Sequence, residues 1–245
     1  KSVAQTPSFI ARFLTEHRKT DDQYAMAISQ LLSLYHIDEH SIKDVIICSV
    51  VPELSDTMKQ AFVKVTGITP MLLGPGIKTG LNIRIDNPAQ LGADLVAGAV
   101  AAVAKYPLPC IIFDLGTATT ISVIDEKGYF LGGTICAGVT ITLEALANKT
   151  ALLPHINIEK PKTVIGTNTI HSMQSGAIYG TAAMIDGIAD RIEEELGQAT
   201  LIATGGLADI IIPVCKRKLE LSEHLLLDGL RIIYQKNKVH TKNTK

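Results

Sequence analysis

The chain has 245 residues, a hydrophobic content of 47% and a formal net charge of −1 at pH 7. A charge this close to zero gives no support for nucleic acid or an anionic membrane surface as a main partner. No apolar run is long enough to span a bilayer and no signal-peptide pattern opens the chain, so we expect a cytoplasmic protein without a membrane partner. The four cysteines are scattered, which favours buried thiols over disulfides or a metal site.

The first hundred residues alternate strand-like with helix-like runs, which indicates an α/β fold. Thr20 and the aspartates after it are typical helix caps, and Pro52 suits the first turn of a second helix. An alanine-rich run from Ala89 to Tyr106 predicts a third helix, which would bridge two halves of the chain. We place the domain boundary there, giving domains of 1–100 and 101–245. The expected strands in this part are 9–14, 44–50 and 71–73.

The second half opens with a strand–turn–strand pattern. A buried strand over Cys110–Phe113 leads into a glycine turn, and a second β-rich run follows from Ile121. Helices are expected from Val139 to Leu146 and from Asn168 to Leu196, the latter as one long helix or as two broken near Gly180. A strand over 201–203 and a last helix from Asp228, preceded by Leu225–Leu227, complete the pattern.

The turn Asp114-Leu115-Gly116-Thr117-Ala118-Thr119-Thr120 is the most informative stretch of the chain. It places a carboxylate at a strand end, beside a glycine and several hydroxyl groups. Backbone N–H groups and threonine hydroxyls in such a turn can approach phosphate oxygens, while the carboxylate can hold a cation. The same run also fits an ordinary hairpin turn between core strands, and the motif alone leaves both interpretations open.

Three other clusters accompany this turn. Asp94 lies in the alanine-rich helix, where aspartate is a mediocre helix former, although a solvent-facing aspartate would need no explanation. The run Gly132-Gly133-Thr134 with Gly138 could serve phosphates or simply allow close packing. The third cluster, Thr204-Gly205-Gly206, is a glycine turn after a strand and is weak evidence alone.

In order and spacing, these motifs together resemble the type III pantothenate kinases. The resemblance runs from about Lys19 to about Asn237 and implies two ribonuclease H-like domains of the actin-like ATPase superfamily, with the site in the cleft between them. It implies ATP-dependent phosphorylation of pantothenate to 4′-phosphopantothenate, the first step of coenzyme A synthesis. The motifs that carry it are Gly76–Leu81, Asp86–Pro88, Gly92–Asp94, Asp114–Thr120, Gly166–Thr169, Met173–Gly176 and Ala203–Leu207.

The resemblance also implies roles for single residues. Asp94 corresponds to the general base that faces the primary hydroxyl of pantothenate. Asp114 corresponds to the ligand of a monovalent cation, K⁺ or NH₄⁺, and Thr117 to a contact with the phosphates of ATP, which carry Mg²⁺. Residues expected to line the pantothenate site are Ile85, Gly92, Ala93, Leu95 and Thr169.

The chain departs from the family in two places. The family opens with a strand ending in Asp-x-Gly-Asn-Thr, the first phosphate loop, and nothing like it precedes Phe9, so we expect that about fifteen residues are missing by truncation. The family also usually has arginine where Leu95 stands and commonly tyrosine at Ile85. A guanidinium can bind a carboxylate or orient an aspartate and leucine cannot, so weaker pantothenate binding is expected unless a group such as Lys78 compensates.

Two alternatives to a pantothenate kinase follow from these features. A degenerate member that binds or regulates without catalysis would fit Leu95 and the absent loop. Another sugar or acid kinase of the superfamily would explain the Asp114 turn, but not the segments around Asp94 and Asn168. Small and apolar residues along 168–196 favour a homodimer built on this helix, as in the family, although burial within its own domain would explain them too.

Overall fold

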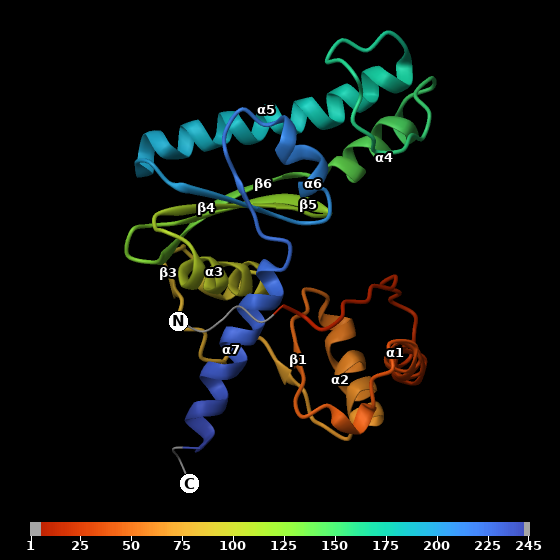
Figure 1. Ribbon diagram of the computed structural model, residues 1–245, viewed down its shortest axis with the longest axis vertical. Coiled ribbons are helices and arrows are strands. Elements are labelled where there is room, and N and C mark those ends of the chain that lie inside the picture. Colours follow the sequence, from red (N-terminus) through yellow and green to blue (C-terminus); the bar gives the residue numbers. More distant parts are fainter. Residues whose placement is uncertain (1–5, 243–245) are drawn as a thin grey trace. The chain divides into compact units, whose positions relative to one another are not determined.

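The computed structural model describes residues 6–242, with side chains through residue 238 (Figure 1). The chain forms two compact units, Lys1–Ile77 and Lys78–Lys245. The alanine-rich helix belongs to the second unit, where it packs against the C-terminal helix. Among the described helices, none combines the length and the apolar character needed to cross a membrane.

The first unit is a pair of packed helices beside a two-stranded parallel sheet. Helix α1 begins with a capping box in which the Thr20 hydroxyl accepts the N–H of Gln23 and the Gln23 side chain accepts the N–H of Thr20. Helix α2 starts at Pro52, as predicted. The core forms around Tyr24 and Leu54. Its elements are α1 (Asp21–Leu34), η1 (Glu39–Ser41), β1 (Ile46–Ile47), α2 (Pro52–Thr66) and β2 (Met71–Leu72).

The strand expected over 9–14 is wrong, because this segment has no regular structure. It is held by its rings instead: Phe9 lies 4.9 Å from Tyr35 and Phe13 lies 6.0 Å from Tyr24 between ring centroids. The strand expected over 44–50 shortens to β1, because its partner β2 offers only two residues for pairing.

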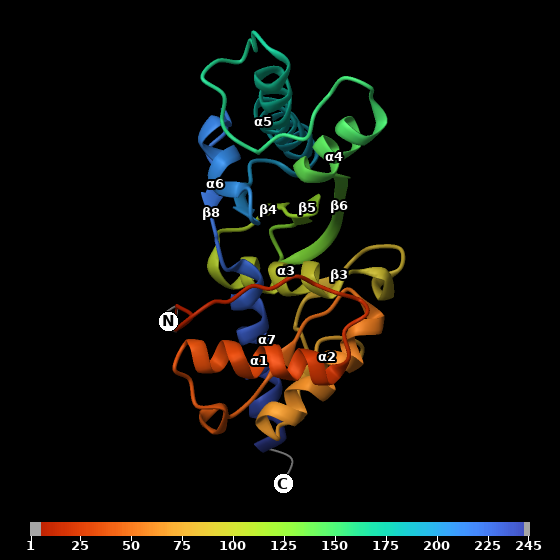
Figure 2. The same cartoon turned by 90° about the vertical axis from the view of Figure 1, so that its right-hand side faces the viewer.

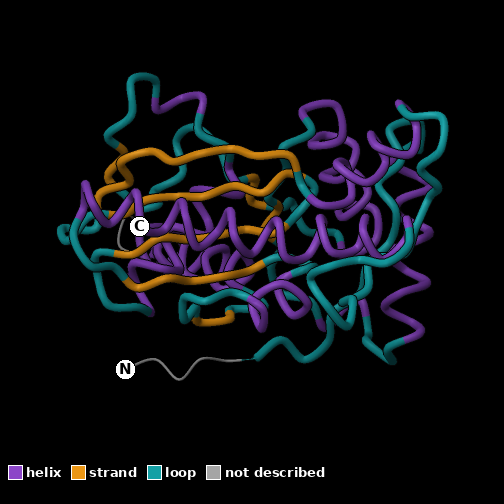
Figure 3. Tube along the Cα trace, turned by 90° about the horizontal axis from the view of Figure 1, so that it is seen from above, coloured by secondary structure: helices purple, strands orange, loops and turns teal. Residues whose placement is uncertain are grey.

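The second unit is a six-stranded sheet with helices on both faces, in the order β3-β6-β5-β4-β7-β8 (Figures 1 and 3). Helices α3 and α7 cover one face and α5 covers the other, as the view in Figure 2 also shows. Alternate residues of β4 enter two different cores, since Ile112 packs on the α3 face and Ile111 on the α5 face. This alternation determines which strand residues share a face below.

The helix from Thr169 is continuous through Gly180, and the last helix begins at Leu225, so the leucines expected before it belong to it. The elements of this unit are β3 (Asn82–Ile83), η2 (Pro88–Gln90), α3 (Ala93–Lys105), β4 (Cys110–Leu115), β5 (Ala118–Ile124), β6 (Tyr129–Ala137), α4 (Val139–Lys149), α5 (Thr169–Leu196), β7 (Thr200–Thr204), α6 (Ala208–Ile211), η3 (Ile212–Val214), β8 (Glu220–Leu221) and α7 (Leu225–Lys242).

Candidate active site

Asp114 lies near the carboxyl end of β4, in the middle of the sheet. Strand β4 pairs in antiparallel fashion with β5 and in parallel with β7, and Asp114 stands opposite Thr120 on one side and Thr204 on the other. Ile112, Ile202 and Ile124 all belong to the core on the α3 face. Because strand side chains alternate, residues two or four positions away lie on that same face. Asp114, Thr120 and Thr204 therefore form one polar row across three strands.

Gly205 closes this row on the β7 side. Its φ of +98° is in the left-handed region, and a methyl group placed there would lie 2.7 Å from Asp114 Oδ1 and 2.6 Å from the Leu115 backbone. Glycine thus lets the turn after β7 approach the carboxylate directly. The Thr204-Gly205-Gly206 turn, which is weak evidence in the sequence alone, therefore lies next to Asp114.

Asp94 lies in the first turn of α3, where the partial positive charge of the helix N-terminus favours a carboxylate. Its Oδ1 accepts the N–H of Leu95 at 2.8 Å. A methyl group on Gly92 would lie 2.4 Å from this oxygen, so the glycine makes room for the carboxylate at the helix start. Gly92, Ala93, Asp94 and Leu95 are all half-buried.

The two aspartates interact. Burial raises the pKa of the Asp114 carboxyl above its ordinary value, and the charge of Asp94 raises it further. Among the described residues, no hydrogen bond or ion pair reaches the Asp114 side chain, so its charge is uncompensated within this part of the chain. A half-buried carboxylate without a partner fits a bound cation, which would offset both the desolvation of its charge and the repulsion from Asp94.

Thr117 lies at the exposed tip of the β4–β5 hairpin. A methyl group on Gly138, the residue before α4, would lie 2.1 Å from the Thr117 carbonyl oxygen, so the tip packs against the start of that helix. A helix N-terminus offers unpaired N–H groups to an anion. Thr117 and the start of α4 thus form a polar corner suited to phosphate oxygens.

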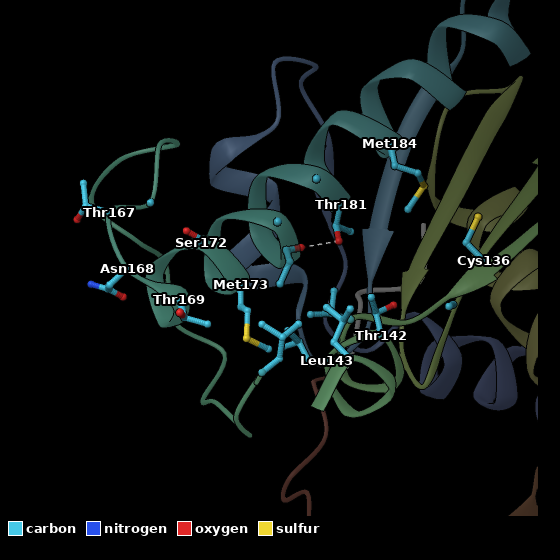
Figure 4. A pocket seen from close by; sticks show the side chains of 18 residues that line it. Cys136, Thr142, Leu143, Thr167, Asn168, Thr169, Ser172, Met173, Thr181 and Met184 are labelled. Carbon is cyan, nitrogen blue, oxygen red and sulfur yellow. Dashed lines mark hydrogen bonds between the residues drawn. The ribbon is translucent and has the colours of Figure 1, made fainter. Parts of the chain in front are cut away.

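Thr169 lies elsewhere in the unit. It starts α5 and lines a groove of about 900 Å³ between α4, α5 and β6, which contains none of the other predicted site residues (Figure 4). Figure 4 shows Thr169 and Asn168 at one end of the groove and Met184 with Cys136 at the other. The chain therefore does not bring Thr169 into one cavity with Asp94.

Ile85 packs against the core on the α3 face, and its Cγ2 would lie 3.8 Å from a methyl group on Gly132. It follows the short edge strand β3, where the Arg84 guanidinium stacks over the Tyr129 ring at 3.9 Å. Ile85 is thus a half-buried aliphatic side chain.

No cluster of three or more His, Cys, Asp or Glu side chains that could hold a metal occurs among the described residues. A cation at Asp114 would have to draw its other ligands from hydroxyl, carbonyl, water or phosphate oxygens.

The cysteines differ in reactivity: burial raises the pKa of Cys110 to about 12, and burial together with the charge of Asp186 raises the pKa of Cys215 to about 12. Cys136 is half-buried and lines the groove.

The family model of the type III pantothenate kinases matches residues 4–191. The chain belongs to the type III pantothenate kinase family. The family's enzyme from Exiguobacterium sibiricum is 44% identical over 227 residues, 93% of this chain and 90% of that protein. That from Shouchella clausii is 44% identical over 232 residues, 94% of this chain and 91% of that protein. This confirms the family that the motifs indicate.

A solved structure supports the fold. The crystal structure described as a Baf family transcriptional activator from Campylobacter jejuni has a TM-score of 0.53 and 18% identity, covering 86% of this chain and 88% of that one. The expected α/β fold is confirmed. At this identity the likeness bears on the fold alone.

Proposed function

We propose that this chain is a cytoplasmic type III pantothenate kinase, which transfers the γ-phosphoryl group of ATP to the primary hydroxyl of pantothenate in coenzyme A synthesis. Family membership over most of the chain supports the reaction. At the site, the proposal rests on Asp94 in the first turn of α3 together with Asp114, a half-buried carboxylate without a partner among the described residues. Phosphoryl transfer needs a carboxylate that orients the acceptor close to positive charge, and a cation bound at Asp114 would supply that charge.

Asp94 acts as the general base. Its Oδ1 is engaged by the Leu95 amide, which leaves Oδ2 for the substrate hydroxyl. A carboxylate is a weak base toward an alcohol, so Asp94 mainly orients the hydroxyl and takes its proton late, as the new P–O bond forms.

Thr117 and the start of α4 contact the phosphates of ATP, which carry Mg²⁺ with them. Asp114 holds a monovalent cation, K⁺ or NH₄⁺, and its lack of a partner among the described residues supports this role. When bound, these cations supply positive charge that offsets the charge of the transferring phosphoryl group.

Pantothenate contacts the start of α3 through Gly92, Ala93 and Leu95, with Ile85 beside them and Thr169 from α5. Leu95 and Ile85 can provide apolar contact but no charge for the substrate carboxylate, so another basic group must bind it. Lys78 remains the candidate we propose. Its backbone is fixed by two hydrogen bonds with the Asn237 side chain, which leaves the ammonium group to act separately.

A homodimer explains the position of Thr169. Met173, Ala177 and Ile178 of α5 are buried against its own sheet, so part of the apolar surface predicted for a partner belongs to the core. Gly176, Gly180 and Ala183 are exposed, and a methyl group on either glycine would meet no atom within 4 Å. We propose that a second copy packs along this stripe, and that Thr169 completes the partner's substrate site.

The experiment is an assay of phosphopantothenate formation by the Lys1–Lys245 chain, in parallel with a chain preceded by an Asp-x-Gly-Asn-Thr strand. Product from either chain supports the kinase, and product from the extended chain alone assigns the first phosphate loop an essential role. Pantothenate binding without product from both chains would favour the alternative, a family member that binds or regulates without catalysis.

A further inference from the structure

The polar row on the α3 face contains two hydroxyl groups to which family resemblance assigns no role. Thr120 stands directly opposite Asp114 in the antiparallel β4–β5 pair, and Thr204 stands opposite it in the parallel β4–β7 pair. All three side chains point to the α3 face, because Ile112, Ile124 and Ile202 on the same strands pack into the core there. One carboxylate is thus flanked by two hydroxyl oxygens from different strands.

Of the two threonines in this row, Thr204 is the more enclosed. It is only 8% exposed, yet no described residue hydrogen-bonds to its hydroxyl, nor to that of Thr120. The Thr204 hydroxyl oxygen is not among the fully buried polar atoms without a partner, so it faces accessible space in which a ligand can reach it. Its neighbour Asp114 is also without a partner among the described residues, and burial raises the pKa of that carboxyl.

The row has defined ends. On the β7 side the backbone of Gly205 lies against Asp114 Oδ1, which leaves no room for any side chain there. On the β6 side the next residue opposite Thr120 is Ile135, which is apolar and 76% exposed. Within β5, β4 and β7 the side-chain oxygens of this row come from Thr120, Asp114 and Thr204; beyond β7, Ser222 follows β8, is 7% exposed and donates its N–H to the Ala203 carbonyl.

We propose that the hydroxyl oxygens of Thr120 and Thr204 join the Asp114 carboxylate as ligands of the monovalent cation. This inference rests on the proposed function for the presence of that cation. Oxygen atoms are the ligands that hard cations prefer. The three side chains together carry a single negative charge, which one monovalent ion neutralises, whereas Mg²⁺ usually keeps several waters and is bound with substrate phosphates. Both threonines are positioning residues for the ion and do not touch the reacting atoms.

The test measures cation binding without catalysis. The midpoint of thermal unfolding is followed during titration with KCl, with tetramethylammonium chloride keeping the ionic strength constant, in the presence and absence of the Mg²⁺ complex of a non-hydrolysable ATP analogue. A ligand that binds only the folded state raises this midpoint in proportion to its occupancy. The K⁺ midpoint is the K⁺ concentration that gives half of the maximal rise in the unfolding temperature. We expect Thr120→Val and Thr204→Val each to raise this K⁺ midpoint by at least about tenfold, as loss of a supporting group in a metal site does.

Thr119→Val is the matched control. Thr119 adjoins Thr120 and is 1% exposed, but alternation puts it on the opposite face of the sheet, so its valine variant should keep the wild-type K⁺ midpoint. Thr204→Ser keeps the oxygen and should bind K⁺ nearly as the parent does. If Thr204→Val does not fold, Thr204→Ala replaces it in the comparison with Thr204→Ser.

Unchanged K⁺ midpoints in the Thr120 and Thr204 variants would overturn the inference, as would a parent chain whose unfolding does not respond to K⁺ under either nucleotide condition. Phosphopantothenate formation is assayed separately. A chain that forms product while its threonine variants bind K⁺ normally contradicts only the ligand assignment. A chain that loses K⁺ binding in those variants yet never forms product, even with the phosphate loop supplied, contradicts only the kinase.

Discussion

The charge of Asp94 raises the pKa of the Asp114 carboxyl, although Asp94 begins a helix and Asp114 ends a strand. Their environments differ in a way that suits two tasks. Asp94 lies at a helix N-terminus that favours its charge, whereas Asp114 is half-buried beside Gly205 and lacks a compensating partner among the described residues. One carboxylate is suited to accept a proton and the other to hold a cation.

Asp94→Asn should lower kcat by about 10²–10⁴-fold, because the amide keeps the shape of the side chain and loses the proton acceptor. Folding and ATP binding should change little. The measurement is steady-state phosphopantothenate formation, with the thermal unfolding midpoint and ATP titration as controls. A kcat equal to that of the parent chain would remove Asp94 from the mechanism.

Asp114→Asn should stabilise the protein at pH 7 in the absence of K⁺. The folded-state pKa of Asp114 is raised above the ordinary 3.8, first by burial and then by Asp94. A carboxyl group with a raised folded-state pKa contributes its full stabilisation to the folded protein at a pH below its unfolded-state pKa. That stabilisation is lost as the pH rises through the folded-state pKa. The advantage of the asparagine variant should therefore shrink as the pH falls toward 4.

The measurement for Asp114→Asn is the unfolding midpoint between pH 4 and pH 8 in tetramethylammonium chloride. Addition of K⁺ should stabilise the parent chain and leave the variant unchanged. A variant that is less stable than the parent by the same amount at every pH would show that Asp114 has a structural partner instead.

Gly205→Ala should destabilise the fold by more than about 2 kcal/mol and impair K⁺ binding, since alanine is strained at φ +98° and its methyl group would meet the Leu115 backbone. Gly206→Ala is the control, because a methyl group there meets nothing within 4 Å. Urea unfolding of both variants gives the comparison. Equal free energies of unfolding would contradict the close approach at Gly205.

Gly180→Glu should turn the proposed dimer into a monomer at micromolar concentration. The monomer has open space at this position, so the glutamate costs little within one chain but would clash with a partner helix. Gly74→Glu makes the same chemical change at another open position in the first unit and should leave the dimer intact. Sedimentation velocity distinguishes the two. A parent chain that sediments as a monomer would contradict the dimer itself.

Local sequence signals predicted the elements that local interactions determine. The Thr20 cap and Pro52 placed α1 and α2, and the apolar run before Asp114 placed β4. The segment 9–14 was assigned wrongly because its aromatic residues pack on helix rings instead of pairing as a strand. Pairing partners and compact units depend on contacts between distant segments, which no local pattern reports.

For the site, too, the sequence indicated single residues but not how they are grouped. The motifs single out Asp94, Asp114 and Thr117 one by one as proposed site residues, but the row of Thr120, Asp114 and Thr204 depends on the register of three strands. Thr120 belongs to the quoted turn and Thr204 to the glycine turn after β7, so both were within recognised motifs. The signal that could have singled them out is their common place at strand ends, where side chains of adjacent strands meet.

The different environments of the cysteines make the groove accessible to chemical labelling. With a pKa of about 12, Cys110 and Cys215 carry thiolate in about one molecule in ten thousand at pH 8, so alkylating reagents will react with them very slowly. Cys136 lies inside the groove beside α5, where a second copy would cover it. Its alkylation rate, followed by peptide mass spectrometry across a dilution series, would therefore report association of the subunits without any engineered label.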